Sequence, residues 1–210
     1  GNVIHRGTGT LRLLGALTIG GALQQTAGLW DANGQALTVR GAANMSGGVY
    51  RPDVAPQTFG GALTLATGAT LRVDLNGLNG QSSQLQVAGA VNVTGATLQV
   101  VTGFTPSTGA SFMLIDNDSN SPVVGTFAGL PQGATLVVGG VTFQMNYQGG
   151  DGNDVVLTVV PGRVLTLTPT ATSTAPTATP TPTTTTTPPV TLTPPVTLTP
   201  PVTLTPPTSD

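Results

Sequence analysis

The stretch LTIGGALQQTAGLWDANGQALTVRGAANM, residues 17–45, contains the pattern that decides the fold. In this pattern an apolar-x-apolar triplet is followed, after one to three residues, by Gly-Ala. It starts at Leu17, Leu37, Leu63, Leu85 and Val91. The first four starts are separated by roughly 20–26 residues, which is the length of one coil of a β-solenoid. In such a fold each coil adds strands to parallel sheets, and only the stack buries a core.

Short alternating runs of Leu, Val and Thr, bounded by Gly and Asn, continue from Thr10 to about residue 160. They predict β-strands, and no run of ten or more residues has helical apolar spacing without a glycine inside it. We therefore expect an all-β protein: a parallel β-solenoid (β-helix) over residues 1–103 with a β-rich C-terminal cap over 104–162. An antiparallel β-sandwich is the alternative, because turns every 8–12 residues also fit that fold.

The last part of the chain has a different composition. All 29 glycines precede residue 163, whereas 12 of the 18 prolines follow it, so residues 163–210 are predicted to be an extended Thr/Pro-rich tail. The tail ends in three copies of PPVTLT, and a six-residue repeat keeps its apolar side chains on the same edge of an extended strand. We expect this edge to dock on a neighbouring subunit by strand addition, the alternative being a tail ordered only against the body of its own chain. The predicted assembly residues are Val190, Leu192, Val196, Leu198, Val202 and Leu204.

The chain has very few charges: no Lys, no Glu, 7% charged residues in all and a net charge of −2. There is no basic footprint for nucleic acid and no apolar segment near the ~20 residues of a membrane span, so neither nucleic-acid binding nor membrane insertion is expected. Cysteine is absent, which excludes disulfides. Charged side chains ordinarily keep a protein hydrated and soluble, and this chain has few of them. We therefore expect O-linked sugars on the tail to supply that hydration. The predicted glycosylation sites are Thr181, Thr183, Thr184, Thr185, Thr186 and Thr187.

Two segments resemble calcium loops. GGDGNDVVL (149–157) fits a nine-residue calcium repeat once, with Asp154 as ligand and Asp151 beside it. Calcium in such repeats lies between consecutive copies, so a single copy favours a Gly-rich hairpin turn, and we expect no cofactor, with calcium at these two aspartates as the alternative. Residues 116–120 start like an EF-hand loop but lack its sixth-position Gly and its final Glu, which favours a loop closed by Asx hydrogen bonds.

Residues suited to catalysis or binding are scarce. The carboxylates Asp31, Asp53 and Asp74 stand in ordinary turn contexts, and the single histidine, His5, lies in a polar N-terminal segment, so we expect no enzymatic activity. A sugar-stacking patch is the binding alternative, and its residues would be Trp30, Tyr50 and Arg51. Three Asn-x-Ser/Thr sequons, at Asn44, Asn92 and Asn117, are common by chance in a Thr-rich chain.

Residues 61–158 contain the strings LIDND (114–118), GTFAGLPQGA (125–134) and GGDGNDVVLT (149–158). In this order they resemble a block of large bacterial surface proteins with autotransporter-type β-helical repeats. The resemblance implies an extracellular, cell-surface, β-rich protein and supplies no catalytic residues. The combined expectation is a structural subunit of an extracellular filament or cell-surface fibre, a helical homo-oligomer carrying covalent glycans. The alternative is a surface adhesin or stalk segment that binds a glycan or a protein partner.

Overall fold

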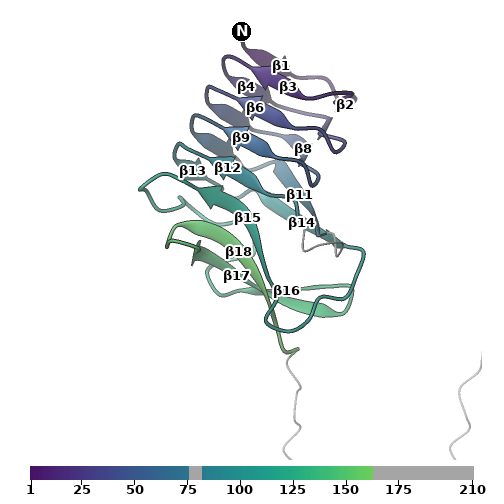
Figure 1. The fold of residues 1–210 in the computed structure, drawn as a ribbon, viewed down its shortest axis with the longest axis vertical. Coiled ribbons are helices and arrows are strands. Elements are labelled where there is room, and N and C mark those ends of the chain that lie inside the picture. Colours follow the sequence, from purple (N-terminus) through teal and green to yellow (C-terminus); the bar gives the residue numbers. More distant parts are fainter. Residues whose placement is uncertain (76–81, 163–210) are drawn as a thin grey trace, which may run out of the picture. The chain divides into compact units, whose positions relative to one another are not determined.

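The computed structural model describes residues 1–75 and 82–162, which belong to one compact unit, Gly1–Leu165. These residues form 18 β-strands and no helix. The first fifteen strands wind into stacked coils, which run from purple to teal in Figure 1. The expected all-β parallel β-solenoid is confirmed.

Each coil contributes one strand to each of three sheets in turn, which we name sheets A, B and C. Sheet A is formed by β1 (Val3–His5), β4 (Leu23–Gln25), β7 (Ala43–Met45), β10 (Leu63–Leu65) and β13 (Val91–Asn92). Sheet B is formed by β2 (Thr10–Arg12), β5 (Leu29–Asp31), β8 (Gly48–Arg51), β11 (Ala69–Leu75) and β14 (Thr97–Thr102). Sheet C begins with β3 (Leu17–Ile19), β6 (Leu37–Val39), β9 (Gln57–Phe59), β12 (Leu85–Val87) and β15 (Ser111–Asn117).

All neighbouring strands within these five coils are parallel, so the antiparallel sandwich is wrong. The register also corrects the coil boundaries inferred from the sequence. In sheet C, Leu17 lies beside Leu37, Leu37 beside Gln57 and Gln57 beside Leu85, which gives two coils of equal length followed by a longer one. Leu63 belongs to sheet A, so the intervals that begin or end at Leu63 compared positions in two different sheets. The residue equivalent to Leu37 in the next coil is Gln57. Because Gln57 is polar, the apolar-x-apolar pattern did not detect this coil.

The core is the space enclosed by the three sheets. Alternate residues of each short strand point inward, and the same register position in successive coils builds columns of buried side chains. Trp30, Tyr50 and Leu71 form such a column in sheet B. Burial of a large side chain contributes about 1.5–3 kcal/mol, but one coil leaves its apolar face uncovered, so the coils are stable only as a stack.

A column of glycines lines the corner between sheets C and A. A Cβ at Gly41 would lie 2.7 Å from the carbonyl carbon of Gly21, and one at Gly61 would lie 2.7 Å from that of Gly41. These contacts are with backbone atoms, which cannot move aside as a flexible side chain can. The repeated Gly-Ala of the sequence pattern is therefore required because adjacent coils approach each other too closely for a side chain at this corner.

Three antiparallel strands close the C-terminal end of the stack. Sheet C continues from β15 to β18 (Asp154–Val160), β17 (Val141–Gly149) and finally β16 (Thr135–Val138). The fifth coil ends in β15, which pairs with β12 in parallel, so coil geometry extends beyond residue 103 into the segment expected to be the cap. In Figure 1 the green strands β17 and β18 follow β15 at this end of the stack.

Candidate functional site

The first coil forms one end of the stack. Its strands β1, β2 and β3 are the outermost members of sheets A, B and C, so each has one edge without a strand partner among the described residues. The N–H of Leu17 donates to the carbonyl of Ala36 at 3.0 Å. Because successive residues of a strand direct their backbone groups to opposite sides, the N–H and C=O of Thr18 point to the open edge. An open strand edge of this kind can pair with a β-strand of another chain.

The opposite end of the stack is closed more thoroughly. The N–H of Val93 donates to the carbonyl of Val124, and the N–H of Val124 donates to the carbonyl of Val91, so a sixth segment covers the end of sheet A. The buried Tyr147 anchors this segment, because its hydroxyl accepts from the N–H of Phe127 and donates to the carbonyl of Leu130. Burial raises the pKa of Tyr147, so the hydroxyl remains protonated and able to donate. At this end, β16 is the outermost strand of sheet C.

In the part of the chain that the structure describes, exposed large apolar side chains lie only at these two ends. Among the described residues they are Ile4 and Leu14 on the first coil, and Val124 and Val137 after the fifth coil. Leu14 is 91% exposed and Val137 is 69% exposed. The described residues of the second, third and fourth coils, which are covered on both sides, expose none. Apolar exposure that coincides with open strand edges is typical of a surface that binds another chain.

A ladder of charges runs along the outer face of sheet B. Arg12 donates to the carboxylate of Asp31 at 2.9 Å, and Arg51 donates to that of Asp74 at 2.7 Å. Arg51 also lies 3.6 Å from Asp31, which connects the two pairs, and Arg72 lies 3.4 Å from Asp74. The hydrogen bond to Asp74, helped by the charge of the nearby aspartates, raises the pKa of Arg51.

This ladder accounts for two of the carboxylates considered for catalysis. Asp31 is buried and, like Asp74, is engaged by arginines. The carboxylate of Asp53 accepts from the N–H of Val54 at 2.9 Å, within a turn that holds Asp53 at φ 57°. The ladder was not predicted from the sequence, although Arg12, Asp31 and Arg51 hold the same register position in successive coils and so recur once per coil.

The proposed sugar-stacking patch is wrong. Trp30 and Tyr50 are 0% and 1% exposed, and both point into the core. Trp30 packs edge-on against His5, which lies in the paired strand β1 rather than in a loose terminus. The hydroxyl of Tyr50 donates to the buried Gln57 at 2.8 Å, and burial raises the pKa of Tyr50. Trp30 and Tyr50 therefore stabilise the core and are not available to a glycan.

The two calcium-like segments lie side by side and bind each other. Asp154 is buried, and its carboxylate accepts from the N–H of Asn117 at 2.7 Å. The Asn117 side chain accepts from the N–H and the hydroxyl of Ser119, so the expected Asx loop is confirmed. Gly149 pairs with Asp154 across the turn between β17 and β18, which confirms the hairpin. Within residues 1–75 and 82–162, no group of three or more His, Cys, Asp or Glu side chains is arranged to hold a metal ion.

The three asparagines of the Asn-x-Ser/Thr sequons differ in their exposure to solvent. Asn44 is exposed on β7, Asn92 is partly exposed on β13, and Asn117 is buried in the loop contacts just described, which removes it as a glycan acceptor. The predicted assembly and O-glycosylation residues, like the rest of the tail from residue 163 onward, lie outside the described residues. The described part of the chain has no helix long and apolar enough to cross a membrane.

Comparisons of the chain with protein-family models, with curated proteins and with solved structures find no match. The function is therefore inferred from the geometry of the stack and its two ends.

Proposed function

We propose that this chain is a structural subunit of an extracellular filament or cell-surface fibre, and that copies join head to tail through the ends of their coil stacks. The observation that supports it most directly is the coincidence of open strand edges and exposed apolar side chains at those ends. A contact between two different ends of identical subunits is heterologous, and repetition of such a contact gives an open polymer.

The alternative function, a surface adhesin that binds a glycan, has less support. Its aromatic residues Trp30 and Tyr50 are in the core. Three surface pockets, of about 270, 300 and 360 Å³, are lined by polar residues together with Gly, Pro, Met and small aliphatic residues, and no aromatic residue is among them. Sugar recognition commonly uses an aromatic face, which these pockets do not supply.

An extracellular or bacterial cell-surface location is part of the same proposal. It is supported by the resemblance of residues 61–158 to bacterial surface proteins and by the Thr/Pro-rich composition of residues 163–210. We include in the proposal that the tail of one copy docks on a neighbouring copy through Val190, Leu192, Val196, Leu198, Val202 and Leu204. The prolines of each PPVTLT copy remove two backbone donors, so the tail would add to a sheet edge and not enter a sheet interior.

A backbone substitution at the open edge tests the polymer directly. Thr18→Pro removes an N–H that points to the open edge of sheet C and leaves the bond from Leu17 to Ala36 intact. Thr18→Val is the matched control, since it keeps the N–H and the strand propensity. Negative-stain microscopy and sedimentation velocity should show filaments for the parent chain and Thr18→Val, and folded monomers or short oligomers for Thr18→Pro. Monodisperse monomers of the parent chain at high concentration would refute the proposal.

Removal of the tail repeat separates its contribution from that of the coil ends. A chain lacking residues 188–210 should remain folded by circular dichroism, because the strands of the coil stack and its cap are all formed by residues 3–160. If the tail forms the joint, this chain no longer gives long filaments. Filaments of unchanged length and stability would show that the coil ends suffice and that tail docking is wrong.

A further inference from the structure

The few charges of this chain are segregated along the stack. Residues 1–75 carry five arginines and three aspartates, a formal charge of +2. Residues 82–162 carry four aspartates and no basic residue, a formal charge of −4. With 7% charged residues in the chain, this separation leaves one end of the stack basic and the other acidic.

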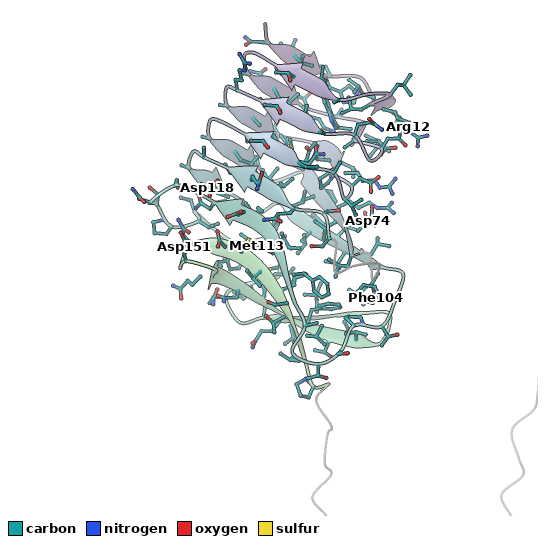
Figure 2. All side chains as sticks on the ribbon, in the orientation of Figure 1. Arg12, Asp74, Phe104, Met113, Asp118 and Asp151 are labelled. Carbon is teal, nitrogen blue, oxygen red and sulfur yellow. The ribbon has the colours of Figure 1, made fainter. Side chains whose placement is uncertain are left out.

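The charges nearest each end are the least compensated. Arg6 follows β1 on the first coil and is exposed, and the side chain of Arg12 is 56% exposed although it is paired with Asp31. Asp118 and Asp151 are exposed in the loop after β15 and in the turn between β17 and β18. Figure 2 shows Arg12 beside the first coils and shows Asp118 and Asp151 at the level of the last layers.

Among the described residues, the aspartates of the acidic end have no arginine partner. Within the described residues the ion pairs join Arg12, Arg51 and Arg72 to Asp31 and Asp74. None of them involves an aspartate beyond residue 82. Partial burial, together with the charges of Asp118, Asp154 and Asp151, raises the pKa of Asp116. The four carboxylates of residues 82–162 repel one another, and a cation from another molecule would relieve that repulsion.

We propose that the two ends are complementary docking surfaces for a second copy of this chain, the basic first coil of one copy binding the acidic capped end of the next. This inference rests on the proposed function and adds that charge determines the head-to-tail orientation of neighbouring copies. Arg6 and Arg12 face the carboxylates around Asp118 and Asp151, and the exposed Leu14 and Val137 supply apolar area at the same joint. Contacts between two like ends bring like charges together, so copies associate in one orientation.

Salt is the first test. Attraction between exposed charges falls with ionic strength, because the Debye length shortens from about 30 Å at 0.01 M to about 3 Å at 1 M. Sedimentation velocity of the full chain should give an association at least about tenfold weaker in 0.5 M than in 0.02 M sodium chloride, which corresponds to about 1.4 kcal/mol. Apolar contacts alone would be strengthened, or left unchanged, by the same salt.

Charge reversal identifies the surfaces. Arg6→Asp alters the basic end, and the double variant Asp118→Arg with Asp151→Arg alters the acidic end. No side-chain hydrogen bond or ion pair of the described residues involves these three side chains, so the fold should persist. Each altered chain should associate poorly by itself, whereas an equimolar mixture should assemble, because the carboxylate introduced by Arg6→Asp on one chain then meets the arginines introduced by Asp118→Arg and Asp151→Arg on the other. Arg40→Asp is the matched control, since it makes the same charge change on an exposed residue between the second and third coils.

The outcomes distinguish the two proposals. Assembly that is lost on single reversal, restored on mixing and unaffected by Arg40→Asp supports the charged joint. Filaments that form equally in all variants and at all salt concentrations would overturn it while leaving the structural function in place. Absence of assembly by the parent chain at low salt would overturn both.

Discussion

Substitution of Gly41 by alanine should destabilise the coil stack strongly for so small a change. The added methyl group would lie 2.7 Å from the carbonyl carbon and oxygen of Gly21 and 3.0 Å from the nitrogen of Ala22. Carbon atoms in contact need about 3.5 Å, so the two coils must separate by about 0.8 Å at this corner. The hydrogen bond from the N–H of Gly41 to the carbonyl of Gly21, now 3.0 Å, would then exceed the normal range.

The magnitude follows from two contributions. Overpacking in a rigid site costs about 1–3 kcal/mol, and loss of one backbone hydrogen bond adds about 1 kcal/mol, so the free energy of unfolding should fall by about 2–4 kcal/mol. For a unit of this size the melting temperature should fall by about 4–16 °C, measured by circular dichroism and checked by urea unfolding.

Gly15→Ala is the matched control for Gly41→Ala. No atom lies within 4 Å of a Cβ at Gly15, so the methyl group meets open space. This variant should be neutral or stabilised by up to about 1 kcal/mol through the unfolded state. If Gly41→Ala and Gly15→Ala unfold within about 0.5 kcal/mol of each other, close approach of the coils is not what excludes a side chain at Gly41.

Three further predictions concern single groups. Tyr50→Phe should lower the free energy of unfolding in urea by about 1–3 kcal/mol, because the buried side-chain oxygen (Oε1) of Gln57 loses its hydroxyl donor; an unchanged urea midpoint would contradict this. The raised pKa of Asp116 means that the folded state binds this proton more tightly than the unfolded chain does, so its contribution to stability should rise as pH falls from 7 towards about 4. Asp116→Asn should therefore melt higher than the parent chain at pH 7, and its advantage should disappear at pH 4; a pH-independent difference would refute the assignment. Material from the native source should exceed the 20.9 kDa sequence mass by whole hexose units located between residues 181 and 187, and an unmodified intact mass would exclude the glycans.

The fold class and two of the local turns were predictable from the amino-acid sequence. Strands as short as LTI (17–19) and LTV (37–39) cannot bury a core alone, and their recurrence with Gly-Ala leaves stacked coils as the way to cover their apolar faces. The hairpin before β18 and the Asx loop after β15 were also predictable. Both depend on local chemistry, the conformational freedom of glycine and the short side chain of asparagine, which acts within a few residues.

The register, and with it the role of individual side chains, became visible only in the folded stack. A polar Gln57 replaced the apolar residue expected at its position, so the pattern matched Leu63 of another sheet, and only the pairing of β6 with β9 restored the true coil. That register directs Trp30 and Tyr50 inward and places Asp31 between Arg12 and Arg51. Sequence pattern could not assign these roles, because an outward and an inward residue of a three-residue strand differ by one position, whereas the neighbours that bury or neutralise them lie a whole coil away.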